Sequence, residues 1–349
     1  MKTVNVMISR NLGGIEQAFS DYCNALKMYN HQVFAVIDNG CKIQAQLEAL
    51  QPDKIIKIPF VHYNYLLICY LYFKLKSYAP DVIIVHNKKA IPIFKAVARM
   101  LNAKIIGVSH NPKYKQVNKC DGIFTITRYQ KEIFSDKGFP RDNIFVVPNL
   151  ISEQRAFIPI TEFHNPPVIG TMGRFDPMKG FPDFIDALAI LKRKKVPFQA
   201  VIGGAVQESY KKEYERIAAK VKLFGLEKDV KFLGWVQNKD EFFDKIDVFV
   251  LPSRFEPFGI VLLEAMMRSK PIVSSEAEGP REIFAGNPEC AYLFPMENPE
   301  KMAAQLEKSI TNLSQTREVA KNGYELCQKN YTLNRVAEKL NQALSYFAK

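Results

Sequence analysis

The stretch SRFEPFGIVLLEAM, from Ser253 to Met266, decides how the second half of the chain folds. The apolar run VFVLP leads into it and the helix-like run IVLLEAMM completes it, so a Pro-Phe-Gly turn joins a strand to a helix. Glu256 is then expected on the loop at the carboxyl end of the strand, and Glu264 one turn into the helix. Because the first amides of a helix have no partner within the helix, the turn predicts an anion site flanked by two acids.

An alternative interpretation gives the two acids no function. Glu264 would pair with Arg268 four residues further along the helix, a contact that contributes about 0.2–0.5 kcal/mol, and Glu256 would be solvated. The apolar neighbours of Glu264 argue against this, because a carboxylate on a mostly apolar helix is costly unless something binds it.

Length and composition indicate a globular protein of two domains. A chain of 349 residues with 47% hydrophobic and 24% charged residues can bury sizeable cores. The six cysteines are scattered, without a CxxC pair or a His at metal-ligand spacing, so neither disulfides nor zinc is predicted and a cytoplasmic location is expected. No secretory signal is predicted, and the apolar run Leu66–Phe73 is much shorter than the roughly 20 residues of a spanning helix.

The net charge of +12 lies mostly in residues 1–165, which indicates an anionic partner. Nucleic acid is the least favoured partner, since the lysines are not interleaved with exposed aromatic residues on a binding motif. A phosphorylated substrate and an anionic membrane surface both remain. The segment Tyr63–Tyr78 carries Lys74 and Lys76 near its end, and its periodicity fits an interfacial membrane anchor and a buried or groove-lining helix equally well.

Both halves alternate short apolar runs with amphipathic ones, which predicts an α/β protein. We expect two facing Rossmann-like doubly wound domains, with ligands in a deep interdomain cleft at the carboxyl ends of the strands. Residues 1–150 would form the first domain, 151–166 a proline-containing linker and 167–330 the second domain, and residues 332–349 are expected to pack back on the first.

The expected strands are Val4–Ser9, Gln32–Ile37, Lys54–Ile58, Asp81–His86, Lys104–Ser109, Gly122–Ile126, Ile144–Val147, Val168–Met172, Phe198–Ile202, Val230–Leu233, Val248–Leu251, Ile272–Ser274 and Tyr292–Phe294. The expected helices are Ile15–Tyr29, Lys42–Ala49, Tyr65–Tyr78, Lys89–Met100, Arg128–Lys137, Phe181–Lys194, Gln207–Phe224, Lys239–Lys245, Ile260–Arg268, Pro299–Asn312, Thr316–Lys329 and Leu333–Phe347.

Two features of the first half carry possible chemistry. Gly13 and Gly14 stand at a strand-to-helix turn, where backbone amides can approach a phosphate; the alternative is a simple helix start, and no GxGxxG fingerprint is present. His86 and His110 each follow an apolar run, so both are expected at strand ends. Each suits a hydrogen bond to a sugar hydroxyl or assistance to a proton transfer, with a structural hydrogen bond as the alternative.

The turn GTMGRFDPMKG, from Gly170 to Gly180, presents Arg174 and Lys179 between a strand and a helix. A guanidinium and an ammonium five residues apart suit a diphosphate leaving group, because charge that develops on its oxygens needs fixed donors. The chain contains no DxD pair of the kind that shares a divalent ion on a nucleotide diphosphate. Together these features predict a site without a metal.

The motifs EPFGIVLLE with its E-x7-E spacing, GRFDPMKG, VKFLGWV, the early glycine pair and a His at a strand end together resemble the GT4 family of retaining glycosyltransferases, which has the GT-B fold. The resemblance implies transfer of a hexose from a nucleotide diphosphate sugar, with a UDP-sugar favoured, to a hydroxyl of a glycan or lipid-linked acceptor. It also implies lipopolysaccharide or surface polysaccharide synthesis, on the inner face of the cytoplasmic membrane, with neither a cofactor nor a metal.

The same resemblance assigns roles to individual residues. Arg174 and Lys179 would hold the donor diphosphate, Glu264 the ribose and Glu256 the hydroxyls of the transferred sugar, while His110 would lie beside the reacting carbon. Glu16 and Asn87 are weaker candidates for the acceptor side. The implied catalytic residues are His110, Glu256, Arg174 and Lys179, and the implied donor contacts are Gly14, Arg174, Lys179, Trp235, Val236, Glu256, Gly259, Ile260, Val261 and Glu264.

Two other classes of function remain open at this point. One is a nucleotide-sugar epimerase of the same fold, which would form product without an acceptor. The other is a catalytically silent nucleotide-sugar binder or membrane scaffold, against which the intact charged residues argue.

Overall fold

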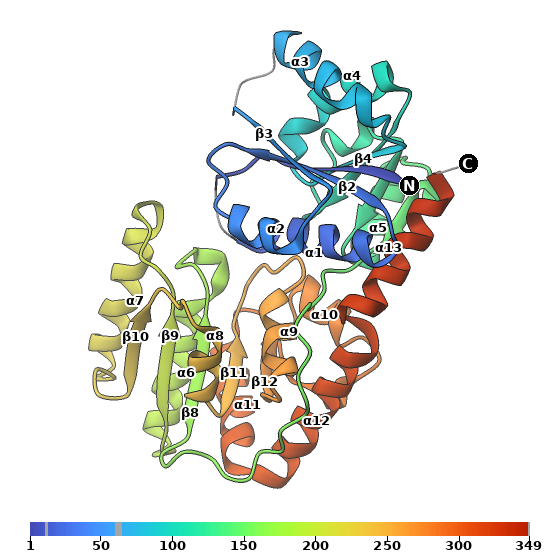
Figure 1. Ribbon diagram of the computed structural model, residues 1–349. Helices are drawn as coiled ribbons and strands as arrows, with labels where there is room; N and C mark the ends of the chain where they lie inside the picture. Colours follow the sequence, from blue (N-terminus) through green and yellow to red (C-terminus); the bar gives the residue numbers. More distant parts are fainter. Residues whose placement is uncertain (11–12, 60–64, 348–349) are drawn as a thin grey trace. The chain divides into compact units, whose positions relative to one another are not determined.

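The computed structural model describes residues 1–10, 13–59 and 65–347, and the chain divides into two compact units (Figure 1). Unit 1 comprises Met1–Ser152 and Asn330–Lys349, and unit 2 comprises Glu153–Lys329. Each unit has one parallel sheet with helices on its faces, so the α/β prediction is confirmed. The cleft expected between the domains stays a prediction.

The sheet of unit 1 has the strand order β3-β2-β1-β4-β5-β6-β7, and all its pairs are parallel. The order reverses between β1 and β4, which makes this the topological switch point of the unit. The strands are β1 (Lys2–Met7), β2 (Gln32–Asp38), β3 (Lys54–Ile58), β4 (Val82–Val85), β5 (Lys104–Ser109), β6 (Gly122–Thr125) and β7 (Ile144–Val146), and the helices are α1 (Gly14–Met28), α2 (Gln44–Leu50), α3 (Tyr65–Leu75), α4 (Ile91–Leu101), α5 (Arg128–Asp136) and α13 (Leu333–Phe347).

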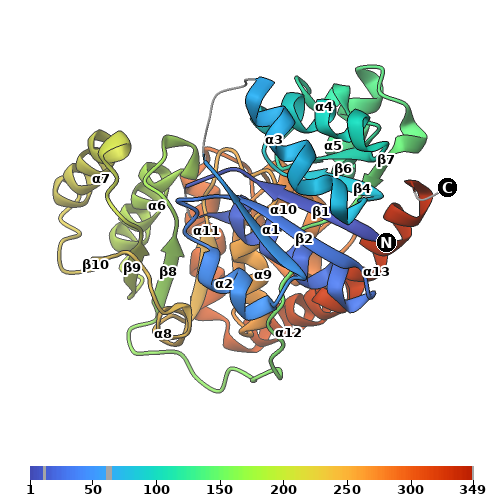
Figure 2. The same ribbon diagram turned by 45° about the horizontal axis from the view of Figure 1, so that its top comes forward.

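Helices cover both faces of this sheet. Helices α3, α4 and α5 lie on one face, and α1, α2 and α13 lie on the other (Figure 2). The apolar side chains of each group form a core against the sheet. Helix α13 packs along α1 although the two lie at opposite ends of the sequence. Phe347 reaches β6 so closely that a Cβ on Gly122 would overlap its ring. The last helix is therefore part of the core of unit 1.

The sheet of unit 2 repeats this order as β10-β9-β8-β11-β12-β13, and it reverses between β8 and β11. Its main core lies between the sheet and helices α6, α7, α11 and α12. The strands are β8 (Val168–Met172), β9 (Gln199–Gly203), β10 (Val230–Gly234), β11 (Val248–Leu251), β12 (Ile272–Ser275) and β13 (Tyr292–Phe294), and the helices are α6 (Phe181–Arg193), α7 (Lys211–Leu223), α8 (Lys239–Asp244), α9 (Ile260–Met267), α10 (Glu278–Ile283), α11 (Pro299–Thr311) and α12 (Leu313–Asn330).

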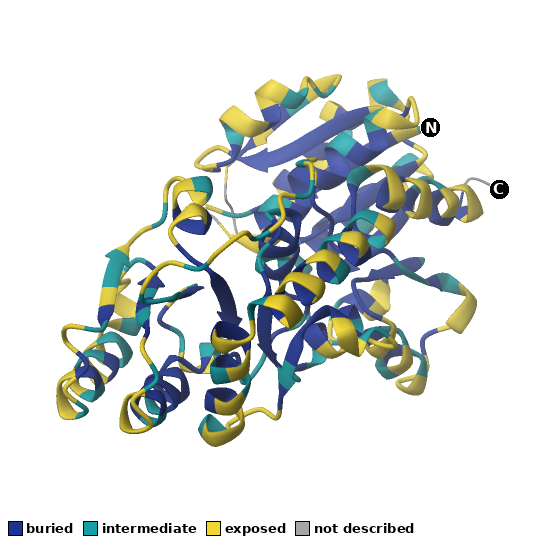
Figure 3. Ribbon diagram, turned by 90° about the horizontal axis from the view of Figure 1, so that it is seen from below, coloured by how far each residue is buried: buried dark blue, intermediate teal, exposed yellow. Residues whose placement is uncertain are grey.

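Burial explains why the strands are easy to read in the sequence. Strands such as β4 and β11 are buried along their whole length, because helices cover both faces of a parallel sheet (Figure 3). Every predicted strand is present, with ends that differ by at most two residues. The predicted helix Gln207–Phe224 begins instead as a 3-10 turn, Glu208–Tyr210, before α7, and the short helix α10 was not predicted.

Helix α3 has one buried and one exposed face. Leu67, Ile68, Leu71 and Leu75 point into the core, whereas Tyr65, Leu66 and Phe73 are exposed. Tyr63 and Asn64, the first residues of the predicted segment, lie outside the described residues. None of the helices in residues 13–59 and 65–347 combines the length and the apolar character needed to cross a membrane.

Candidate functional site

The switch point of unit 2 brings together two loops that the sequence singled out. Strands β8 and β11 are parallel neighbours, so their carboxyl ends lie at the same edge of the sheet. The turn with Arg174 and Lys179 follows β8, and the loop with Glu256 follows β11. The Lys179 ammonium lies 2.7 Å from Glu256 Oε2, in a mostly buried ion pair. Ligands of doubly wound sheets bind at this kind of position.

Backbone contacts lock these two loops to each other. The amides of Arg254 and Phe255 donate to the Met178 carbonyl oxygen at 2.8 and 3.2 Å. Gly180 has φ +67°, and a Cβ there would overlap the Pro252 carbonyl oxygen. Glycine is therefore required at position 180 both by the backbone angle and by the approach of the second loop.

A side-chain pair that the sequence analysis missed joins the loops again. The Arg254 guanidinium donates through Nε and Nη2 to both carboxylate oxygens of Asp183, at 2.8 and 2.6 Å. This bidentate contact raises the pKa of Arg254 above its usual value. Asp183 lies in the first turn of α6, directly after the Lys179 turn, and an acid in a first helical turn is the only local signal of its role.

Arg174 has a different environment from Lys179. It is largely exposed, with Nη2 3.9 Å from Asp176 Oδ2 and the guanidinium carbon 6.0 Å from the centre of the Tyr210 ring. These are weak contacts, so its side chain can reorient toward a ligand. Lys179, in contrast, is held in place by Glu256.

The amino end of α9 follows directly on Glu256. Gly259 caps the helix with φ +99°, a left-handed angle that favours glycine. Within the described parts of the chain, the amides of Gly259, Ile260 and Val261 donate to no acceptor. Helix N-termini carry a partial positive charge and free N–H groups, so this end of α9 is suited to an anion.

Glu264 is buried in α9 and pairs with a residue that the sequence analysis did not consider. Its Oε1 lies 2.5 Å from Nζ of Lys239, the first residue of α8. The alternative pairing with Arg268 was wrong, because the Arg268 guanidinium donates to the Glu264 carbonyl oxygen at 3.2 Å and to Asp240 at 2.8 Å. Lys239 lies far from Glu264 in sequence, so no local spacing marks the pair.

Trp235 and Val236 follow β10 at the same edge of the sheet. Val236 packs against the end of β9, since a Cβ on Gly203 would lie closest to its Cγ2 methyl. Trp235 stays more than half exposed, so its ring is accessible to a ligand, and the donor contact that the resemblance implies for it stays a prediction.

The switch point of unit 1 holds the remaining predicted residues. Gly13 caps α1, which begins at the exposed Gly14, and residues 11–12 lie outside the described part. Glu16 is buried and accepts a hydrogen bond of 2.6 Å from Ser9 Oγ. Asn87 uses both ends of its amide within the protein: Nδ2 donates to the Ile8 carbonyl oxygen, and Oδ1 caps a 3-10 turn at Lys89. This structural role gives no support to Asn87 as an acceptor-binding residue.

His86 and His110 lie together at the ends of β4 and β5. Nδ1 of His86 is 3.2 Å from Nε2 of His110, and the two rings are stacked with their centres 5.3 Å apart. Burial, followed by the nearby Lys88 ammonium, lowers the pKa of His110 to about 3. Burial, followed by His110, lowers the pKa of His86 well below its usual value. Both rings are therefore neutral at pH 7.

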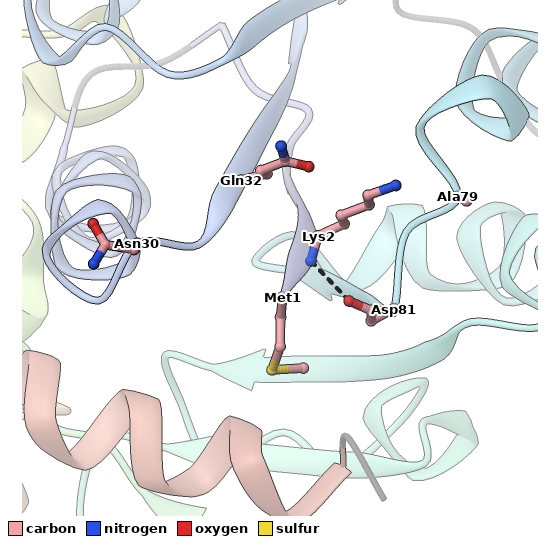
Figure 4. A pocket seen from close by; sticks show the side chains of 6 residues that line it. All are labelled: Met1, Lys2, Asn30, Gln32, Ala79 and Asp81. Carbon is pink, nitrogen blue, oxygen red and sulfur yellow. Dashed lines mark hydrogen bonds between the residues drawn. The ribbon is translucent and has the colours of Figure 1, made fainter.

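A shallow cavity of about 440 Å³ lies at the amino ends of β1 and β2, where the Lys2 amide donates to Asp81 Oδ2 (Figure 4). This is the edge of the sheet opposite to the predicted residues, so the cavity is not a candidate for the same site. Over residues 1–10, 13–59 and 65–347, no three His, Cys, Asp or Glu side chains gather where they could bind a metal ion.

Comparisons with known proteins agree with this arrangement. Residues 12–155 match the family described as Glycosyltransferase Family 4, and residues 153–326 match the family described as Glycosyl transferases group 1. The lipopolysaccharide core biosynthesis glycosyltransferase LpsE of Rhizobium meliloti is 25% identical over 343 residues, which are 95% of this chain and 96% of LpsE. An uncharacterized glycosyltransferase of Haemophilus influenzae is 25% identical over 89% of this chain and 91% of its own length.

Solved structures show the same fold. HepE of Anabaena in complex with UDP superposes with a TM-score of 0.85 at 18% identity, over 99% of this chain and all of HepE. A glycosyltransferase from Rickettsia africae gives a TM-score of 0.86 at 16% identity, over 100% of this chain and 98% of its own. The chain thus belongs to the GT4-type glycosyltransferases with the GT-B fold, and it is a transferase.

Proposed function

We propose that the protein is a retaining, metal-independent glycosyltransferase that moves a hexose from a nucleotide diphosphate sugar, with a UDP-sugar favoured, to a hydroxyl of a glycan or lipid-linked acceptor. The observation that carries the proposal is the Lys179–Glu256 pair at the switch point, beside the amino end of α9. The name of LpsE supports a role in lipopolysaccharide or surface polysaccharide synthesis, and the UDP complex of HepE supports the choice of nucleotide.

Different residues of unit 2 would bind different parts of the donor. Lys179, Arg174 and the first amides of α9 would bind the diphosphate, where negative charge grows as the bond from the anomeric carbon to the leaving oxygen lengthens. Glu264 would accept hydrogen bonds from the ribose hydroxyls, and the second oxygen of Glu256 from a hydroxyl of the transferred sugar. Lys179 contacts Glu256 through Oε2, so one carboxylate oxygen stays available for the sugar.

No carboxylate in this proposal acts as a nucleophile on the sugar. Glu256 is paired with Lys179 and Glu264 with Lys239, so each carboxylate already contacts a cation, which fits a binding role. The acceptor proton would go to an oxygen of the leaving diphosphate, on the face of the sugar that the diphosphate departs from. Retention of the anomeric configuration follows from attack on that face.

A panel of nucleotide sugars tests the donor. Thermal unfolding is measured with UDP-, GDP- and ADP-sugars, because a ligand at 100 times its Kd adds about 2.7 kcal/mol of stability. The sugar that raises the Tm is then incubated with glycan and lipid-linked acceptors, and the anomer of the product is identified by NMR. An inverted product would refute retention, and a new sugar formed without any acceptor would indicate an epimerase.

Chelation tests the metal separately. The positive groups on the two loops lead us to expect equal turnover with EDTA and with added Mg²⁺ or Mn²⁺. A loss of turnover in EDTA that Mg²⁺ restores would refute metal independence without affecting the assignment as a glycosyltransferase.

We also propose that the protein works in the cytoplasm, peripherally bound to an anionic membrane through α3. Leu66 and Phe73 expose large apolar side chains on this helix, and the Lys76 ammonium lies 4.7 Å from the centre of the Phe73 ring. An apolar face bordered by lysines suits the surface of an anionic bilayer.

Sedimentation with vesicles tests this surface. The protein should sediment with phosphatidylglycerol vesicles and less with phosphatidylcholine vesicles, and the double variant Leu66→Ser/Phe73→Ser should stay in the supernatant. Met100→Ser, at an exposed apolar position on α4, is the matched control. Equal sedimentation of the double variant and the control would contradict the proposal.

A further inference from the structure

Three polar side chains form a continuous buried row across neighbouring strands of unit 1. Asn5 lies in β1, His86 follows β4 and His110 follows β5. Strand β4 pairs with β1 on one side and with β5 on the other. Oδ1 of Asn5 is 3.0 Å from Nε2 of His86, and Nδ1 of His86 is 3.2 Å from Nε2 of His110. All three side chains are buried, so each hydrogen bond must have a donor and an acceptor.

The contacts of Asn5 determine which atom donates and which accepts in each hydrogen bond of the row. Nδ2 of Asn5 lies 3.2 Å from the Phe19 carbonyl oxygen, which can only accept, so the amide nitrogen must face Phe19. The amide oxygen then faces His86, and it too can only accept. The proton of His86 therefore sits on Nε2, and its Nδ1 is a bare acceptor because the ring is neutral.

The tautomer of His86 in turn determines the tautomer of His110. Since Nδ1 of His86 accepts, Nε2 of His110 must donate, and the neutral His110 ring carries its only proton there. The remaining nitrogen, Nδ1 of His110, has no hydrogen-bond partner in the described part of the chain. It carries a bare lone pair.

The groups packed around the row keep both rings neutral. Helix α1 contributes the rings of Phe19 and Tyr22, whose centres lie 5.5 and 4.8 Å from that of His86. Burial raises the pKa of Tyr22, and burial also raises the pKa of Cys23 on the same helix, so neither supplies a negative charge. On the side of His110, the Lys88 ammonium donates to Asn111 and repels a second positive charge.

We propose that Asn5 and His86 are positioning residues that fix the tautomer of His110, so that His110 presents a bare Nδ1 to a hydroxyl group of the sugar or of the acceptor. Such a nitrogen accepts a hydrogen bond from a hydroxyl and repels a phosphate or carbonyl oxygen. The identity of the hydroxyl rests on the proposed function, whereas the tautomer is a property of the protein alone.

Two substitutions of His86 separate positioning from packing. His86→Phe keeps a ring against Phe19 and Tyr22 but removes the acceptor for His110. His86→Asn leaves a smaller side chain whose amide oxygen replaces Nδ1 as an acceptor. We expect His86→Phe to be the more stable of the two variants. Its kcat should nevertheless be about tenfold below that of His86→Asn, because one hydrogen bond changes the population of the His110 tautomer by about that factor. If His86 had a purely structural role, the more stable variant would also be the more active one, so His86→Phe would have both the higher stability and the higher kcat.

NMR of the ¹⁵N-histidine-labelled protein reads the tautomer directly, with no substrate present. In the wild-type protein, His86 and His110 should each show a protonated Nε2 and an unprotonated Nδ1, and His86→Phe should shift the His110 signals toward a mixture. A protonated Nδ1 on His110 in the wild-type protein would overturn the inference, as would a kcat of His86→Phe equal to that of His86→Asn. If the wild-type protein shows the expected tautomers but no glycosyl transfer, the proposed function fails and the tautomer assignment stands.

Discussion

Replacing Lys179 with Met tests whether its ammonium stabilises the leaving group. The substitution keeps an unbranched side chain but removes the charge that lies 2.7 Å from Glu256 Oε2. In enzymes, loss of one fixed donor to a developing negative charge lowers kcat by about 100- to 1000-fold. We expect a loss of this size in the kcat of glycosyl transfer, because Lys179 is held rigidly and Arg174, which is largely exposed, cannot replace it without reorienting.

The same change also affects folding, and the chain offers a matched control. Lys220 pairs with Asp186 at 2.6 Å between α7 and α6 of the same unit, and its side chain is 23% exposed, against 22% for Lys179. Partly exposed ion pairs contribute about 0–1 kcal/mol. Lys179→Met should cost about 1–2 kcal/mol of unfolding free energy, more than Lys220→Met, because it leaves the more deeply buried Glu256 without its cation.

The assay compares the two variants at saturating donor and acceptor, at a temperature where circular dichroism shows both to be folded. Urea unfolding gives the stability difference independently. Lys220→Met should retain wild-type turnover and Lys179→Met should lose it. Equal turnover of the two folded variants would refute the role of Lys179, and unfolding of Lys179→Met alone would show that its contact with Glu256 is mainly structural.

Two further predictions concern unit 2 and unit 1 in turn. Gly180→Ala should lower the Tm clearly more than Gly225→Ala, because both glycines have positive φ but only the Cβ at position 180 would overlap a backbone oxygen; equal Tm values would contradict the close approach of the loops. Stability should be complete above pH 6.5 and fall as the pH drops toward 3, because the unfolded chain protonates His86 and His110 in this range while the folded chain does not. The slope should reach about 1.4 kcal/mol per pH unit for each histidine. Urea unfolding at several pH values should show a shallower slope for His86→Phe, and an unchanged slope would argue against a buried neutral His86.

The strands could be predicted from the sequence because of how parallel sheets are buried. Val82–Val85 and Val248–Leu251 are covered on both faces, so each is a short continuous apolar run, which is typical of a buried parallel strand. Helix α10 escaped prediction for a physical reason: it has only six residues, with Gly279 and Pro280 among them, and so shows no helical period. Its position depends on the loop after β11, since the Gly279 amide donates to the Glu256 carbonyl oxygen.

The site was predictable only as far as topology brings loops together. Arg174, Lys179 and Glu256 could be singled out in the sequence because they follow strand ends, and strand ends of one sheet meet at one edge. Their roles stay predictions. Lys239 and Asn5 were missed because their contacts join distant parts of the chain. Asn5 in particular interrupts an apolar strand, and its partner His86 lies 81 residues away.

The chain leaves unit 1 at Ser152 and returns to it at Asn330, so the N-terminal unit is assembled from both ends of the sequence. During synthesis, the face of the sheet that Phe347 covers, near Phe124 and Phe145, must wait until the last helix emerges from the ribosome. Unit 2 is uninterrupted in sequence and can fold earlier. We therefore expect unit 2 to become native first, and unit 1 to complete its core only after α13 has been synthesised.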